Sequence, residues 1–204
     1  MAELIIVLAA RSQAGYTPRE GDLLFQVAGV SEFSSAIAGA TAMRDSLKFV
    51  HVAMVALEYG VPYVIEATDG KGVVATTLES FLASSHCLNG RPGVVVMRVG
   101  IDFSAGDAVK RARSHLGEDY DWAFLPDNGK MYCSELLYES YRRRDGTHLF
   151  TARPMNFRDA EGNMPEFWTS LFKKQGMSVP EGIPGTNPND ISKEPFLTEV
   201  YRFF

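Results

Sequence analysis

Short apolar runs separated by turn-forming residues recur along the chain and predict a mixed fold of strands and helices. Most of these runs are rich in β-branched and aromatic residues, which favour strands. Two of them are joined by the short connection 58–61, as in a hairpin. The strands predicted in this way cover residues 23–27, 49–57, 62–68, 94–99 and 197–204.

Helices are predicted where apolar residues recur at helical spacing behind a capping residue. Thr76 with Glu79 resembles a capping box, and Ser104 with Asp107 repeats the pattern. The helices predicted in this way cover residues 78–85, 105–115, 134–144 and 165–174. Segments rich in small residues, Gly, Pro or Asn are expected to be irregular, namely a loop at 29–46 and a surface arm at 179–195.

The length and composition of the chain predict one domain. With 204 residues, of which 46% are hydrophobic and 22% charged, the chain is long enough to bury one sizeable core. We expect residues 21–204 to form this domain. Residues 1–20 are then an N-terminal extension or the remnant of a secretion signal.

The N-terminal stretch Leu4–Ala10 is apolar and is followed by small residues, as in a secretion signal, but it lacks the usual preceding basic residues. An ordinary first strand or helix fits the same residues. The stretch is too short to cross a bilayer, so we expect no transmembrane segment. As a signal it would direct the protein to the periplasm or cell envelope, and otherwise the protein is expected in the cytoplasm.

The charge of the chain argues against a nucleic-acid partner. The net charge is −5, whereas binding to phosphates requires a concentrated basic surface. The run Arg142–Arg144 is short and closes a predicted helix, where cations stabilise the negative end of the helix dipole. We therefore expect no nucleic-acid partner, and the sequence leaves the oligomeric state open.

The cysteines point to thiol chemistry rather than to metal binding. Cys87 and Cys133 are the two cysteines, and neither has a neighbour at metal-ligand spacing. A single disulfide between them is an alternative, and it would leave neither thiol free to react. Cys133 begins the predicted helix in the motif Tyr132-Cys133-Ser134-Glu135-Leu136. Backbone N–H groups at a helix start stabilise a thiolate and can hold an oxyanion, which makes Cys133 a candidate nucleophile. The alternative is an inert, buried cysteine.

A candidate base and its orienting acid lie on the predicted hairpin. His51 stands in the apolar strand, with Ala53 and Val55 on the same face by alternation. Glu66, on the next strand, falls beside His51 or within one register step, where it would fix the tautomer of the imidazole. The alternatives are a hydrogen-bonded core histidine and an exposed glutamate. A metal site built from His51, Glu66 and Cys133 is a further alternative, but we expect neither a metal nor another cofactor.

Four motifs together resemble the YiiX-like permuted branch of the NlpC-type peptidases, a papain-like cysteine peptidase and amidase family. In these relatives the histidine strand precedes the cysteine helix, the reverse of the unpermuted order. The resemblance covers roughly residues 20–145. The motifs are Gly21-Asp22-Leu23-Leu24-Phe25, Phe49-Val50-His51-Val52-Ala53, Val64-Ile65-Glu66-Ala67 and Tyr132-Cys133-Ser134-Glu135-Leu136.

The resemblance implies an α+β, papain-like fold with a mostly antiparallel sheet packed against helices. It implies Cys133 as nucleophile, His51 as base and Glu66 as the orienting acid, and it gives Asp22 a supporting structural or hydrogen-bonding role. By position, Tyr132 is expected to line the oxyanion or substrate pocket. Asp121, Asp127 and Asn128, which precede the nucleophile in sequence, are expected to shape the same pocket.

The function predicted on this basis is hydrolysis of an amide bond in cell-wall peptides or related small peptides, with a peptidoglycan fragment as one such substrate. A second hypothesis keeps the three residues but assigns a lipid acyl substrate, because the fold group is also similar to the lecithin:retinol acyltransferase group. A wide apolar groove beside Cys133 would favour lipids, and a narrow polar cleft would favour peptides. A third hypothesis is a non-catalytic envelope binding module.

Overall fold

The computed structural model describes residues 15–41 and 47–204. The stretch Leu4–Ala10, predicted as a signal or a first element, lies outside the described residues. No helix in the part of the chain that the structure describes is long and apolar enough to cross a membrane.

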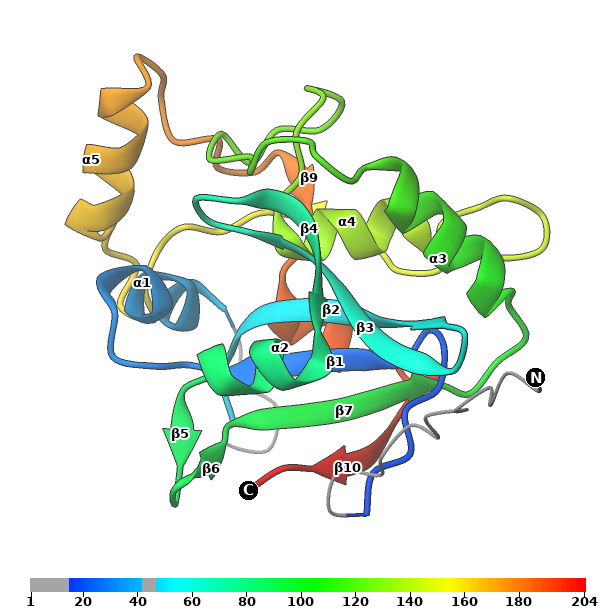
Figure 1. Ribbon diagram of the computed structural model, residues 1–204. Coiled ribbons are helices and arrows are strands. Elements are labelled where there is room, and N and C mark those ends of the chain that lie inside the picture. The colour runs from blue at the N-terminus through cyan, green and yellow to red at the C-terminus, as the bar shows by residue number, and fades with distance from the viewer. Residues whose placement is uncertain (1–14, 42–46) are drawn as a thin grey trace, which may run out of the picture.

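A six-stranded antiparallel sheet forms the centre of the fold, in the order β10-β7-β1-β2-β3-β4 (Figure 1). Adjacent residues of each central strand face opposite sides of the sheet, so each strand contributes to two cores. The strands are β1 (Leu23–Val27), β2 (Phe49–Glu58), β3 (Val61–Thr68), β4 (Gly72–Thr77), β7 (Val94–Val99) and β10 (Leu197–Arg202).

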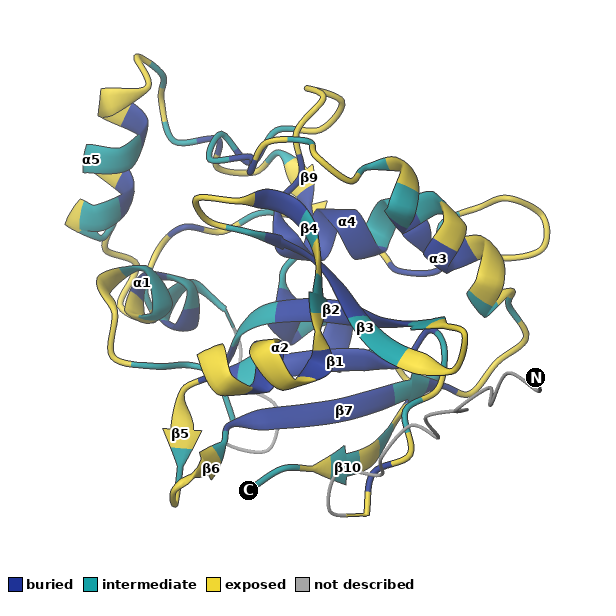
Figure 2. Cartoon of the chain, viewed as in Figure 1, coloured by how far each residue is buried: buried dark blue, intermediate teal, exposed yellow. Residues whose placement is uncertain are grey.

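Helices cover both faces of this sheet, and the central strands between them are buried (Figure 2). On the larger core, α4 packs on β2 and β3 while α3 and α6 pack on α4, and α1 contacts α5 and β2. On the smaller core, α2 packs on β3 and β4. The helices are α1 (Glu32–Ala40), α2 (Leu78–Ser84), α3 (Ala105–Ser114), α4 (Cys133–Ser140), α5 (Glu166–Lys174) and α6 (Pro188–Ser192).

Two short two-stranded sheets complete the structure. The pair β5 (Cys87–Leu88) and β6 (Arg91–Pro92) follows α2, and β8 (Arg153–Pro154) pairs with β9 (Pro184–Gly185). The latter pair joins two segments of the C-terminal third of the chain beside α4 (Figure 1).

Several predicted elements are wrong in type or extent. The segment predicted as a loop contains α1, whose Ala36 and Ala38 are buried, because small residues let a helix pack closely without a strong apolar pattern. The expected irregular arm contains β9 and α6. The strand β4 was not predicted, and Thr77 rather than Thr76 caps α2, accepting the N–H of Ser80 at 3.1 Å.

The helix that begins at Cys133 ends four residues earlier than predicted. It ends at Ser140, and the next residue, Tyr141, is extended with ψ 113°. Tyr141 is fully buried and its hydroxyl donates to the carbonyl of Gly21 at 3.0 Å. This packing of a large side chain outweighs the helix-forming tendency of the following residues, so Arg142–Arg144 lie beyond the helix.

Asp22 joins the N-terminal end of β1 to β7. Its carboxylate accepts two hydrogen bonds from Arg98, at 2.6 and 2.7 Å, and one from the Tyr16 hydroxyl at 2.7 Å. It also accepts the backbone N–H of Arg19 at 2.9 Å. Asp22 is 1% exposed, so its charge is stabilised by these four donors rather than by water.

An irregularity in β2 lies directly before His51. Gln26 of β1 is opposite His51, but its neighbour Val27 is opposite Phe49, so Val50 bulges out of the ladder. The buried side chain of Asn189, in α6, compensates on the other side of Phe49. Its Oδ1 accepts the Phe49 N–H at 2.8 Å, and its Nδ2 donates to the Phe49 carbonyl at 2.7 Å. Asn189 thus takes the place of a strand partner.

Replacing Asn189 by Leu should therefore destabilise the fold. The variant leaves the buried N–H and C=O of Phe49 without this partner, and we expect the free energy of unfolding to fall by about 2 to 4 kcal/mol in urea denaturation. Asn163→Ala, at an exposed turn, is the matched control and should change it by less than about 0.5 kcal/mol. Equal stability of the two variants would show that the Asn189 clamp contributes nothing.

Candidate active site

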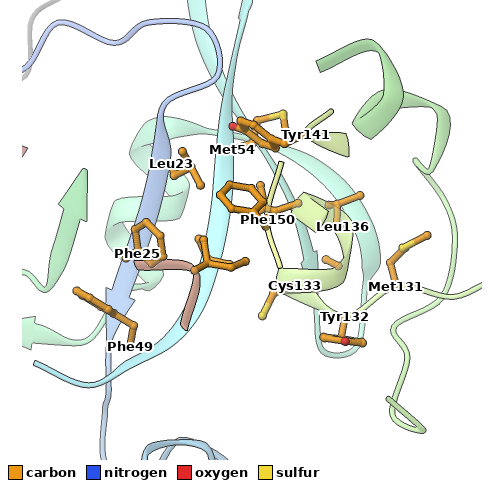
Figure 3. Close-up of a cluster of buried hydrophobic side chains, with 14 of the residues drawn as sticks. Leu23, Phe25, Phe49, Met54, Met131, Tyr132, Cys133, Leu136, Tyr141 and Phe150 are labelled. Carbon is orange, nitrogen blue, oxygen red and sulfur yellow. The ribbon is translucent and has the colours of Figure 1, made fainter. Parts of the chain in front are cut away.

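Cys133 is the first residue of α4 and lies at the edge of the larger core, next to Tyr132 (Figure 3). Tyr132 is the N-cap residue, and its backbone N–H donates to Glu135 in the first turn at 3.4 Å. The first backbone N–H groups of a helix lack partners within the helix and carry its positive dipole end. The thiol of Cys133, 5% exposed, therefore lies in a setting that stabilises negative charge.

His51 and Glu66 form a hydrogen-bonded pair on adjacent strands. The Nε2 atom of His51 is 2.8 Å from Oε2 of Glu66. Continuing the β2–β3 register from Met54 and Ile65 pairs Ala53 with Glu66, so that Glu66 lies diagonally across from His51 on the same face, two residues from the position opposite it. The other carboxylate oxygen accepts a hydrogen bond from Thr76 of β4 at 3.2 Å, so the acid is held from both sides.

The same imidazole lies close enough to Cys133 for that residue to raise the pKa of His51. Because Nε2 faces Glu66, Nδ1 is the ring nitrogen left for the sulfur. The structure thus brings together the three residues that the sequence singled out, from β2, β3 and the start of α4. A ring contact with Phe81 of α2, at 6.0 Å between centroids, supports the other face of the imidazole.

The surroundings of His51 favour its protonated form. Burial by itself lowers the pKa of His51, but the hydrogen bonds to Cys133 and Glu66 and the negative charges of these two groups raise it to about 10. The imidazole is therefore an imidazolium at neutral pH when Cys133 is a thiolate. With its proton held in this way, His51 can pass it to a departing group, which suits the imidazole to acid and base catalysis.

Tyr120 lies between two hollows, one beside Cys133 and the other beside His51. It is 8% exposed and lines both of them. Burial, followed by the negative charge of a Cys133 thiolate, raises the pKa of Tyr120 well above 10, so its hydroxyl stays protonated. The sequence analysis did not find Tyr120, because the contact depends on the turn that carries it back over β3 and β4.

The first hollow, on the Cys133 side, is small and largely apolar. Its volume is about 60 Å³. It is called the acyl-side pocket here, and its walls come from α1, the 120–134 segment and the C-terminal third of the chain. Residues that line it include Cys133, Phe124, Phe157, Trp168, Thr186 and Pro188.

The second hollow, on the His51 side, is larger and polar. Its volume is about 390 Å³, and His51 and Glu66 form part of its wall. Asp69 and Lys71, in the turn between β3 and β4, bring a negative and a positive charge to its rim. The base of this turn is clamped, because Val73 N–H donates to the Glu118 carbonyl at 2.8 Å. This hollow is called the polar groove below.

The five residues predicted to support the site fall in different places. Asp121 is buried, accepts the N–H groups of Ala123 and Leu125 at 2.8 Å each, and lines neither the pocket nor the groove. Tyr132 lines the acyl-side pocket, and its hydroxyl accepts the N–H of Thr186 at 3.2 Å. Asp127 and Asn128 are in an exposed turn, and in the described part of the chain neither lines the pocket or the groove. Asp22 lies at the opposite end of β1 from Gln26, the partner of His51, and holds Arg98 there.

Metal binding finds no support in the geometry. Within residues 15–41 and 47–204, no three His, Cys, Asp or Glu side chains are grouped so that they could hold an ion. Both cysteines are free, and Cys87 is exposed whereas Cys133 is buried. A disulfide between them is therefore absent from this structure.

Comparison with known proteins agrees with this arrangement. Residues 17–201 match the family described as permuted papain-like amidase enzymes of the YaeF/YiiX type, family C92. The chain belongs to this family. The family assignment and the predicted α+β, permuted papain-like fold are thereby confirmed, and the family is described as one of papain-like amidases.

Two relatives illustrate how far the similarity extends. The uncharacterised protein YiiX of Escherichia coli K12 is 26% identical over 202 residues, covering 98% of this chain and 94% of YiiX. A crystal structure of YiiX from Escherichia coli O157:H7 superposes with a TM-score of 0.74 at 25% identity, covering 92% of this chain and 98% of the other. That structure is titled a metalloprotein.

A protonated His51 beside the thiol predicts fast alkylation of Cys133 at neutral pH. An ordinary cysteine, with a pKa of about 8.5, is only a few per cent thiolate at pH 7. In a Cys87→Ser background, which removes the exposed thiol, His51→Ala should slow reaction with iodoacetamide at pH 7 by roughly tenfold or more. Because the raised pKa of His51 is about 10, the protein with His51 should react faster than His51→Ala at neutral pH, and this difference should vanish as the pH rises towards 10. The measurement is the rate of mass gain against pH.

His115→Ala is the matched control and should leave alkylation unchanged. His115 lies at the C-terminal end of α3, where its Nδ1 is 3.0 Å from Oε1 of Glu118. Equal rates with and without His51 would mean that the imidazole does not activate the thiol, and a binding role would then gain weight.

Proposed function

We propose that this protein hydrolyses amide bonds in small peptides, including peptide fragments of the cell wall, with Cys133 as nucleophile, His51 as acid and base, and Glu66 as the orienting acid. The observation that carries the proposal is that Cys133, at a helix start, lies beside His51, whose other side is hydrogen-bonded to Glu66. No metal or cofactor is needed for this chemistry.

The first half of the proposed reaction acylates the enzyme. The Cys133 thiolate attacks the amide carbon, and the oxygen becomes an oxyanion facing the first N–H groups of α4. The C–N bond then breaks as the His51 imidazolium transfers its proton to the nitrogen, which leaves as an amine. The products at this point are a thioester on Cys133, a neutral imidazole and the free amine.

The second half restores the enzyme. The neutral imidazole takes a proton from water, and the resulting hydroxide equivalent attacks the thioester carbon. The C–S bond breaks, the acid is released and the thiolate–imidazolium pair forms again. Glu66, fixed by Thr76, keeps Nε2 of His51 occupied throughout, so that Nδ1 serves the sulfur and the substrate.

The position of the two hollows orients the substrate. The acyl-side pocket touches Cys133 but not His51, whereas the polar groove touches His51 but not Cys133. Because His51 protonates the leaving nitrogen, the amine part of the substrate belongs in the polar groove, near Asp69 and Lys71. A peptide end offers an ammonium and a carboxylate, which match these two charges.

The dimensions beside Cys133 favour peptides over lipids. A long acyl chain needs a wide apolar groove, but the acyl-side pocket has a volume of only about 60 Å³. An engineered cavity of about 150 Å³ accommodates benzene, so this pocket is too small for a chain of that size. The lipid alternative would require the pocket to open.

Cys133→Ala should abolish hydrolysis while leaving the fold intact, because the substitution removes only the attacking sulfur. We expect turnover of muropeptides to fall to background, with an unchanged circular dichroism spectrum and melting temperature within a few degrees. Unaltered hydrolysis in this variant would rule out Cys133 as nucleophile. A parallel assay with acyl lipids separates the two substrate classes, since faster lipid turnover would replace the peptide assignment.

Glu66→Gln should lower kcat/KM by tenfold or more. The amide preserves the shape and a hydrogen bond to His51, but it removes the negative charge that stabilises the imidazolium. The loss should be largest at high pH, where the imidazolium is hardest to maintain. Glu79→Gln, on the exposed side of α2, is the matched control. A pH–rate profile identical to wild type would exclude Glu66 from the proposed mechanism.

A further inference from the structure

Three of the residues that line the acyl-side pocket carry a buried polar atom without a hydrogen-bond partner. Ser134 Oγ, Trp168 Nε1 and Thr186 Oγ1 are buried and lack a hydrogen-bond partner, and all three residues line this pocket. The residues are only 1%, 2% and 6% exposed, respectively. An unpartnered buried polar group is costly, so native proteins seldom keep one without a ligand or water to satisfy it.

The concentration of these atoms in one place is unusual within the molecule. In the described ranges, four buried side-chain nitrogen or oxygen atoms lack a partner, and three of them belong to residues of this pocket. The fourth, Oε2 of Glu118, belongs to a carboxylate whose other oxygen is 3.0 Å from His115. The other three unsatisfied atoms therefore belong to residues that line a single pocket, the one beside Cys133.

The chemistry of the three groups defines what they can bind. An indole N–H only donates, and the two hydroxyls can donate as well. A ligand that satisfies all of them must offer a hydrogen-bond acceptor. Apart from Cys133, which reacts as a thiolate, none of the residues lining the pocket is a charged type, so an anionic acceptor would be buried without a positive counter-charge, at a high cost. The acceptor is thus neutral.

The size of the pocket limits the group that carries this acceptor. About 60 Å³ is well under half of the about 150 Å³ cavity that holds benzene, which leaves room for only a few non-hydrogen atoms. The rings of Phe124 and Phe157, with Trp168, close the walls at centroid distances of 5.1 to 6.1 Å. A hydrocarbon chain would fill this space but would leave the three polar atoms unsatisfied.

We propose that the acyl-side pocket selects a short, uncharged acyl group bearing a hydrogen-bond acceptor, such as a hydroxyl or carboxamide oxygen, and that Ser134, Trp168 and Thr186 are its specificity determinants. This inference rests on the proposed function for its orientation, since it assigns the acyl half of the cleaved amide to this pocket. It excludes an apolar acyl chain as the preferred substrate.

The first test compares two substrates of equal shape. The 2-hydroxypropionyl amide of 7-amino-4-methylcoumarin, as either enantiomer, differs from the isobutyryl amide by a hydroxyl in place of a methyl group. We expect a kcat/KM preference of at least tenfold for one hydroxyl-bearing enantiomer, and little turnover of the decanoyl amide. Thr186→Val, which replaces a hydroxyl by a methyl group, should reduce the preference several-fold, and Thr186→Val with Ser134→Ala should remove it.

Thr198→Val, on the exposed face of β10, is the matched control and should keep the wild-type preference. A preference for isobutyryl or decanoyl in the wild-type enzyme, or a preference that survives the double substitution, would overturn the inference.

A second test does not require turnover. In the Cys87→Ser protein, 2-hydroxypropanamide should protect Cys133 from iodoacetamide at concentrations at least tenfold lower than isobutyramide does. The difference should disappear in Thr186→Val. Equal protection by the two amides, or no protection by either, would contradict the assignment of the pocket.

The two tests separate this inference from the proposed function. If no amide of the panel is cleaved but 2-hydroxypropanamide still protects selectively, the hydrolase assignment fails and the pocket assignment stands. If amides are cleaved without regard to the hydroxyl and protection is equal, the hydrolase assignment stands and the pocket assignment fails.

Discussion

The contact between the thiol of Cys133 and the imidazole of His51 is the interaction on which the site depends. The sulfur comes from the start of α4 and the ring from β2, so the contact exists only because α4 packs on β2 and β3. Two devices keep the ring in place. Glu66, held by Thr76, occupies Nε2, and Asn189 restores the hydrogen bonds of the strand where Val50 bulges beside His51. Bulges of this kind commonly re-aim a side chain next to a functional site.

The two sides of this contact have opposite character. Towards Cys133 the hollow is small and mainly apolar, and towards His51 it is larger and lined in part by charged residues. Burial on the first side excludes water from a carbonyl under attack, which strengthens the helix N–H groups that face it. Exposure on the second side suits a departing amine that must reach solvent.

The residues of the candidate site were easier to predict than their surroundings. Cys133, His51 and Glu66 were found because each stands at a legible position: a helix start, an apolar strand and the partner strand of a hairpin. Tyr120, Asn189, Trp168 and Thr186 were not found, because their roles arise from contacts between segments far apart in the sequence. The same cause explains why α1 and the early end of α4 were not predicted. Close packing of alanines stabilises α1, and burial of Tyr141 ends α4.

The origin of the pocket walls has an evolutionary consequence. Apart from Asn189, the reacting groups and the supports named above lie between β2 and the start of α4, whereas Met155, Phe157, Trp168 and the 186–188 stretch all follow α4 in the chain. Insertions or substitutions in that later part can reshape the recess without moving the sulfur, the imidazole or the carboxylate. Homologues can therefore keep one reaction while diverging in the molecules they accept.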